Sequence, residues 1–217
     1  MRLYLVRHAQ SVNNALAAVG SSEDRVFDPP LTEIGLQQAD LVAQHLQDTM
    51  DMPPDRREEP FGLTHLYCSA MTRSLQTTKP IAAALGLSAE VWIDIHEIGG
   101  LFLNDASGIK GFPGLTRSQI ETDFPGTIMP DTITEDGWWD AASGRETLDA
   151  FISRSIRVAL ALRERATSYE RIALVTHGAF MDALVKALLE RSPQSPDAMF
   201  FVHYNTSITR FDFGPDA

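Results

Sequence analysis

The sequence predicts an α/β fold in three layers, with helices on both faces of a mostly parallel sheet that has one antiparallel edge strand. Two short apolar runs rich in branched side chains, at residues 3–6 and 172–175, are typical of buried strands in such a sheet. Segments with apolar residues at helical spacing alternate with the strands, as in βαβ units. The 217 residues suffice for one complete hydrophobic core, so we expect a single domain over residues 1–217.

The next elements follow from start and stop signals. Residues 13–30 predict a short helix and a polar loop, and Thr32 is a candidate N-cap for the helix that follows. Residues 47–60, with Pro53, Pro54 and a run of mixed charges, predict an exposed connection. A second strand is expected at 65–68.

A helix should run from Ser69, its candidate N-cap, to Leu85. Pro80 lies inside it and removes an amide donor, so we expect a kink or a break there. Residues 90–95 predict a third strand. The last elements expected are a long amphipathic helix from Leu148, a helix after residue 177 and an edge strand at 207–213.

Residues 99–139 are rich in glycine and proline and show little periodicity apart from a short helix at 117–124. Long irregular segments inside compact domains are usually functional covers or disordered. We interpret this one as an inserted cover that sets substrate specificity. Trp138 and Trp139 either line a substrate pocket or anchor the cover to the core.

The composition limits the partners. The formal net charge is −11, which is unfavourable for binding nucleic acid or an anionic membrane. No apolar run reaches the length of a membrane span, and the N-terminus begins directly with a strand, so no signal peptide is expected. The single cysteine, Cys68, excludes an internal disulfide and fits a reducing compartment. We expect a cytoplasmic protein.

Two histidines, His8 and His177, each follow a predicted buried strand. Open α/β proteins build their sites at the carboxyl edge of the sheet, so both rings should meet in one site. Arg7 precedes the first histidine, and Arg73 lies in the first turns of a helix that also begins at a strand end. Gly178 would let the backbone approach a ligand closely. Cations around a neutral imidazole suit phosphoryl transfer, and they should lower the pKa of His8.

The segment Arg7-His8-Ala9-Gln10-Ser11 resembles the signature of the histidine phosphatase superfamily, which contains the phosphoglycerate mutases. Other stretches along the chain resemble the family's further blocks in the same order: Asn14, residues 28–39, 69–78, 96–100, 176–178 and 205–209.

The resemblance implies a phosphoglycerate mutase-like fold and a role for each residue. His8 would attack phosphorus and form a phosphohistidine, while Arg7, Asn14, Arg73, His177 and Gly178 would form the phosphate site. Glu97 would protonate the leaving oxygen and then activate water. The substrate would be a small phosphorylated metabolite and the product inorganic phosphate. No cofactor and no metal are implied.

Some positions depart from the family pattern. Ala9 stands where glycine is usual, Gln10 where the mutases commonly have an acid, and Ala179 where a second glycine often follows the histidine. Paired arginines like those that hold a substrate carboxylate in mutases are not found. These differences favour a histidine acid phosphatase-type hydrolase over a mutase. A non-catalytic phosphate-binding scaffold is a third reading, and a homo-oligomer is allowed.

Two other chemistries fit the sequence less well. In cysteine-based phosphatases a loop of backbone amides separates the thiolate from an arginine, but Arg73 comes one residue too early after Cys68 and the loop lacks glycine. Cys68 should instead pack as a small apolar side chain. No HExxH motif or Cys-His spacing for a metal is present, so His45, His65, His96 and His203 are interpreted as surface or structural residues.

Overall fold

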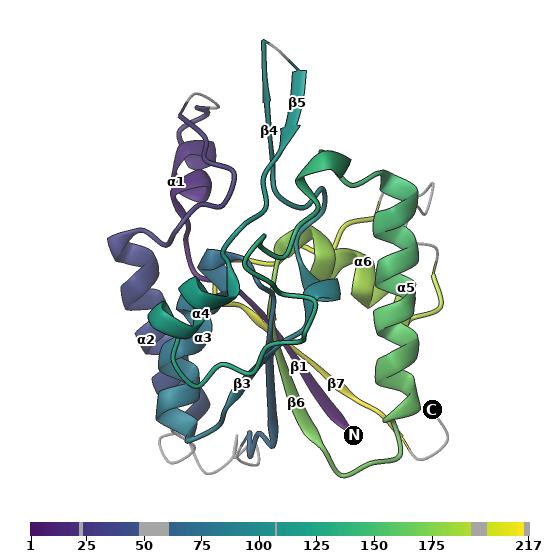
Figure 1. Ribbon diagram of the computed structural model, residues 1–217. Coiled ribbons are helices and arrows are strands. Elements are labelled where there is room, and N and C mark those ends of the chain that lie inside the picture. Colours follow the sequence, from purple (N-terminus) through teal and green to yellow (C-terminus); the bar gives the residue numbers. More distant parts are fainter. Residues whose placement is uncertain (22–23, 48–60, 107, 192–198, 215–217) are drawn as a thin grey trace.

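The computed structural model describes residues 1–21, 24–47, 61–106, 108–191 and 199–214 (Figure 1). Its main sheet has the strand order β3-β2-β6-β1-β7. Strands β1, β2, β3 and β6 are parallel, and β7 pairs antiparallel with β1 at the edge. The strands are β1 (Arg2–Arg7), β2 (His65–Cys68), β3 (Ala89–Val91), β6 (Arg171–Thr176) and β7 (Ile208–Asp212). The predicted mostly parallel sheet with an antiparallel edge strand is confirmed.

Helices cover both faces of this sheet (Figure 1). On one face lie α2 (Glu33–Gln47) and α3 (Thr72–Leu85), and on the other α5 (Leu148–Glu164) and α6 (Gly178–Leu188). Side chains of a strand alternate between faces, so Tyr4 and Val6 join the apolar cluster of α2 and α3, whereas Leu3 and Leu5 join that of α5 and α6. A run that is buried on both faces must be apolar throughout, which explains why β1 reads as a continuous apolar stretch.

Three sequence-based expectations about local structure are wrong. The strand predicted at 90–95 ends at Val91, and a 3₁₀ turn, η2 (Ile93–Ile95), follows it. The break expected at Pro80 as one alternative to a kink is absent: helix α3 is continuous through this residue, because packing against α2 and the sheet holds it together despite the missing amide donor. Ser69 does not cap α3, which begins after Met71.

The expected N-cap at Thr32 is confirmed, since its Oγ1 accepts a hydrogen bond from the amide of Gly35 at 3.0 Å. The short helix in 13–30 is α1 (Val12–Ala18). The connection predicted at 47–60 falls, apart from Gln47, outside the described residues.

Residues 99–139 contain more regular structure than expected. A hairpin of β4 (Phe102–Asp105) and β5 (Gly108–Gly111) projects from the body at the top of Figure 1. The short helix is confirmed as α4 (Arg117–Asp123). Another 3₁₀ turn, η3 (Ala141–Ser143), follows the segment.

The two tryptophans anchor this segment. Trp138 belongs to the core cluster on the α2–α3 face, and Trp139 packs against the same cluster. Trp139 Nε1 donates to the carbonyl of Gly144 at 3.1 Å. Gly100 has a φ of +69°, and a Cβ there would lie 2.3 Å from the Trp139 ring. The ring can lie against the backbone only because residue 100 is glycine.

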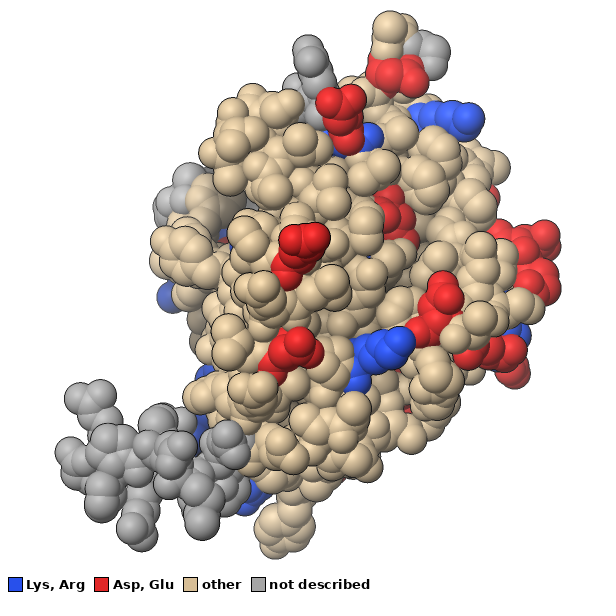
Figure 2. Space-filling model, turned by 90° about the vertical axis from the view of Figure 1, so that its left-hand side faces the viewer, with Lys and Arg blue, Asp and Glu red and all other residues tan. Residues whose placement is uncertain are grey.

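On the face of the molecule that Figure 2 shows, acidic and basic side chains lie scattered among uncharged ones. Among the described residues, no helix combines the length and the apolar character that crossing a membrane requires.

Candidate active site

The sheet register brings the two histidines together. Arg7, the last residue of β1, is paired with Thr176, the last residue of β6. The hydrogen bonding between the two strands continues one residue beyond them, because the His8 amide donates to the Thr176 carbonyl at 2.9 Å. The rings of His8 and His177 therefore lie side by side, with centroids 5.0 Å apart, and both are buried. The predicted meeting of the two strand ends is present in the structure.

The hydrogen bonds of His8 define its tautomer. Nδ1 lies 2.7 Å from the carbonyl oxygen of Ala9, which can only accept, so Nδ1 carries the proton. Nε2 accepts from Nε of Arg73 at 3.1 Å. Burial, and then the positive charges of Arg73 and Arg7, hold the pKa of His8 well below its ordinary value. At neutral pH, His8 is an uncharged imidazole with a lone pair on Nε2.

Arg73 is held by an acidic residue to which the sequence analysis gave no role. Asp28 accepts hydrogen bonds from the amide of Thr72, at 3.1 and 3.2 Å, and from its hydroxyl at 2.7 Å. Its carboxylate also lies 3.8 Å from the Arg73 guanidinium. Asp28 thus occupies the start of α3, where Ser69 was expected to act. The only sequence signal for it is its position at the head of the 28–39 block.

Ser69 instead contacts the second histidine, with Oγ 2.7 Å from Nε2 of His177. Nδ1 of His177 is buried and has no partner among the described residues. Burial, and then the charge of Arg73, keeps the pKa of His177 well below its ordinary value. His177 is therefore neutral as well.

Arg7 is fixed at one end only. Its Nη1 donates to the carbonyl of His203 at 2.6 Å, whereas its buried Nε has no partner among the described residues. A Cβ on Gly178 would lie 3.3 Å from that Nε. Gly178 therefore makes room for Arg7 at the start of α6, rather than lining the cavity described below.

Asn14 belongs to the first turn of α1, where its Oδ1 accepts from the amide of Ser11 at 3.2 Å. Nδ2 of Asn205 also donates to Asn14 Oδ1, at 3.2 Å, and to the carbonyl of His8, at 2.9 Å. These acceptor contacts leave the Asn14 amide nitrogen as a donor. The sequence analysis gave Asn205 no role beyond its place in the 205–209 block, but its side chain ties α1 to the residue that carries the imidazole.

Glu97 lies where η2 meets the start of α6. Its Oε1 accepts from the amides of Ile98 at 3.0 Å and Phe180 at 3.1 Å, and the amide of Ala179 reaches its Oε2 at 3.4 Å. Free amides and the positive end of the helix dipole suit a carboxylate at this position. The charge of Glu97 also acts on both Arg7 and Arg73, opposing the effect of burial on their pKa.

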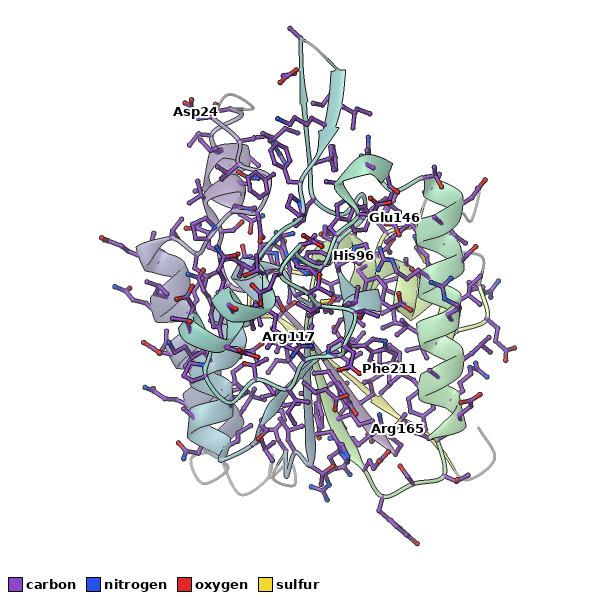
Figure 3. All side chains as sticks on the ribbon, viewed as in Figure 1. Asp24, His96, Arg117, Glu146, Arg165 and Phe211 are labelled. Carbon is purple, nitrogen blue, oxygen red and sulfur yellow. The ribbon has the colours of Figure 1, made fainter. Side chains whose placement is uncertain are left out.

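A cavity of about 490 Å³ opens at this edge of the sheet. Five predicted site residues line it: Arg7, His8, Asn14, Arg73 and Glu97. His177 and Gly178 are not among its lining residues, although the His177 ring lies beside that of His8. The outer walls come from residues 24–27 and Pro29, after α1, and from residues 102–105 of the hairpin. Figure 3 shows Asp24 above α1, at the outer end of the first wall.

Two arginines that the sequence analysis did not consider also line the cavity. Arg25 follows α1, and Arg145 lies just after the 99–139 segment, with its guanidinium 4.9 Å from the centre of the Phe102 ring. Neither forms an ion pair with a described residue. The basic groups at the mouth thus come from loops outside the 99–139 segment, and only folding brings these loops together.

Cys68 is fully buried in the apolar cluster on the α2–α3 face, as predicted. Burial raises its pKa to about 12, so it remains a thiol at neutral pH. Within the described part of the chain, His, Cys, Asp and Glu do not gather in any group of three that could hold a metal ion.

Sequence comparison identifies the class of protein. The profile of the Histidine phosphatase superfamily (branch 1) matches residues 3–217, so the chain belongs to this superfamily. A curated relative named "Probable phosphoglycerate mutase GpmB", from Yersinia pestis (strain Pestoides F), is 38% identical over 88 residues. That match covers 41% of this chain and 34% of the relative, so it spans about a third of the relative's length.

Solved structures share the fold over nearly the whole chain. A mycobacterial glucosyl-3-phosphoglycerate phosphatase, in complex with VO3, has a TM-score of 0.57 at 24% identity, covering 96% of this chain and 90% of its own. A phosphoserine phosphatase from Entamoeba histolytica has a TM-score of 0.57 at 23% identity, covering 97% and 89%. An ecdysone phosphate phosphatase from Bombix mori has a TM-score of 0.62 at 16% identity, covering 96% and 88%. The phosphoglycerate mutase-like fold is therefore confirmed.

Proposed function

We propose that this protein is a metal-independent phosphomonoester hydrolase that forms a phosphohistidine on His8. The observation that carries the proposal is the Nε2 lone pair of His8, which faces Nε of Arg73 at 3.1 Å. A neutral, buried imidazole whose other nitrogen donates to a carbonyl is an oriented nucleophile. The same arginine that now donates to this lone pair is placed to bind the oxygens of an incoming phosphate.

In the first step, a phosphate oxygen replaces His8 as the partner of Arg73. Nε2 then attacks phosphorus in line, and the bond from phosphorus to the ester oxygen breaks. Arg7, Arg73 and Asn14 donate to the non-bridging oxygens, over which the transition state spreads its charge. When the Ser69 hydroxyl donates to Nε2 of His177, Nδ1 of His177 carries a proton and adds a further donor.

Glu97 acts as the general acid: the proton on its carboxyl passes to the leaving oxygen, and the amides of Ala179 and Phe180 then stabilise the carboxylate that this step leaves. In the second step its carboxylate takes a proton from water, and the resulting hydroxide attacks phosphorus. The bond between phosphorus and His8 Nε2 breaks, releasing inorganic phosphate and restoring the neutral ring. Glu97 regains in the second step the proton that it gave in the first, so the cycle closes without a cofactor.

The cavity suits a small phosphorylated metabolite. Its volume of about 490 Å³ leaves room for a leaving group beside the phosphate. The β4–β5 hairpin forms one wall, which supports assigning residues 99–139 as the specificity insert of a single domain over 1–217. Arg25 and Arg145 add positive charge at the mouth, in a chain whose net charge is −11.

Hydrolysis of 4-nitrophenyl phosphate in the presence of a chelator tests this proposal. We expect turnover without added metal, unchanged in Cys68→Ser and lost by several orders of magnitude in His8→Ala. Inactivity of the wild type across the pH range would favour a phosphate-binding scaffold. Loss of turnover in Cys68→Ser with retention in His8→Ala would contradict the assigned nucleophile.

Mutase activity is the second candidate, favoured by the curated relative named as a phosphoglycerate mutase. Incubation with 3-phosphoglycerate and 2,3-bisphosphoglycerate separates the two. A mutase accumulates 2-phosphoglycerate, whereas the hydrolase that we propose releases inorganic phosphate.

A further inference from the structure

We propose that a buried ion pair outside the cavity, Arg154 with Glu146, acts as a positioning device for Glu97. This pair, called the Arg154–Glu146 strut below, touches neither the cavity nor the residues around phosphorus. The inference rests on the proposed function, in which Glu97 is the proton donor.

The strut is bidentate and almost completely buried. Nε and Nη2 of Arg154, on α5, each donate to a carboxylate oxygen of Glu146 at 2.8 Å. The two side chains are 3% and 7% exposed. Removing two charges from water costs free energy that their attraction often fails to recover, so stability alone is a weak reason for such a pair.

The strut holds the backbone on both sides of Glu97. Nη1 of Arg154 donates to the carbonyls of Asp94 at 2.6 Å and His96 at 2.9 Å, just before Glu97. Just after it, Oε2 of Glu146 accepts from the amide of Gly99 at 3.2 Å, and the Glu146 amide donates to the Gly99 carbonyl at 3.0 Å.

The same strut reaches the group that binds the Glu97 carboxylate. The Arg154 guanidinium lies 5.1 Å from the centre of the Phe180 ring, and the amide of Phe180 donates to Glu97 Oε1 at 3.1 Å. Arg154 therefore contacts both the backbone that carries Glu97 and the residue that orients its carboxylate. The planar guanidinium makes these contacts simultaneously, which the single ammonium of lysine cannot do.

His96 links this assembly to the cover. Its Nδ1 donates to the carbonyl of Glu97 at 2.8 Å, and its ring centre lies 5.1 Å from that of Trp139. Figure 3 shows His96 and Glu146 near one another at the upper end of the sheet, beside α5. Glu97 is thus held between the strut and the anchored 99–139 segment.

The test uses substituted phenyl phosphates, which differ in leaving-group pKa but hardly in shape. A weakened proton donor slows the esters with poor leaving groups most, so we compare kcat/KM for 4-nitrophenyl phosphate with that for phenyl phosphate. We expect Glu97→Gln to raise the ratio of these two values by at least about 10-fold, since general acids contribute about 10²–10⁴-fold. Glu146→Gln and Arg154→Lys should raise it in the same direction.

The matched control is Arg157→Ala. Arg157 also lies on α5 and pairs with Asp94 at 3.6 Å, but it is exposed and bonds none of the backbone around Glu97. We expect its ratio to equal that of the wild type. Glu146→Gln retains an acceptor for Arg154 and the backbone amide bond to Gly99, and thermal unfolding of each variant reports whether it is folded.

The outcomes separate the two proposals. If Glu97→Gln changes the ratio while both strut variants lower the two kcat/KM values equally, or leave them unchanged, the strut has no positioning role. If Glu97→Gln itself leaves the ratio unchanged, the assignment of Glu97 as proton donor fails, and the positioning role fails with it.

Discussion

Acidification should destabilise this protein steeply, because three buried histidines are neutral in the folded state. Burial is the largest cause of the lowered pKa at His8, His96 and His177, and at His96 the pKa falls to about 4. The ordinary value is 6.5. As the pH falls through 6.5 the unfolded chain binds protons that the folded protein does not, so the free energy of unfolding decreases.

The magnitude follows from proton linkage. Between pH 7.5 and 5.5 each such histidine removes about 1.4 kcal/mol from the free energy of unfolding, and the three together about 4 kcal/mol. Carboxylates with a lowered pKa, such as Glu146, titrate below this window. Asp28 acts in the opposite sense, because burial raises its pKa and the folded state binds its proton more readily.

Urea unfolding at the two pH values measures this loss, and His96→Gln isolates one contribution. The pH-dependent part of the unfolding free energy should shrink by about 1.4 kcal/mol in this variant. If the wild type is equally stable at pH 7.5 and 5.5, or the variant keeps the full pH dependence, these rings are not neutral and buried as described.

Three further substitutions, one of them with a matched control, test individual contacts. Asp28→Asn removes the charge that holds Arg73 and the start of α3. The value of kcat/KM should therefore fall about 10-fold, corresponding to about 1.4 kcal/mol. An unchanged value would show that Arg73 needs no counter-ion. In steady-state assays, Arg145→Ala should raise KM several-fold at low salt and less at high salt, because it removes from the mouth a cation that pairs with no described carboxylate. Gly100→Ala should lower the free energy of unfolding by about 2–4 kcal/mol in urea titrations, since its Cβ meets an indole ring. Gly86→Ala, also at positive φ but facing open space, should cost only about 1 kcal/mol, and equal losses would contradict the steric account.

Much of the fold could be predicted from the sequence, because β1 and β6 are buried on both faces and their apolar runs are unmistakable. The positions of His8 and His177 could be predicted as well, because the carboxyl ends of two parallel strands lie at the same edge of the sheet. The boundary at Val91 could not be predicted in this way. Ile93 and Ile95 belong to η2 but are as apolar as strand residues, so composition alone does not mark where the strand ends.

The supporting residues were harder to predict because they act across long sequence separations. Asp28 caps a helix that begins 44 residues later, and local capping rules therefore pointed to Ser69. The Arg154–Glu146 strut is an ordinary pair of charges on an amphipathic segment until folding buries it. Arg25 and Arg145 flank the cavity only after the loop following α1 and the β4–β5 hairpin come together.

Trapping of the phosphorylated protein tests the central claim most directly. Rapid quenching during turnover of a phosphomonoester, followed by peptide mapping, should locate an acid-labile, base-stable phosphate on His8 Nε2, and none should form in His8→Ala. Phosphate on any other residue, or sustained turnover by His8→Ala, would contradict the account.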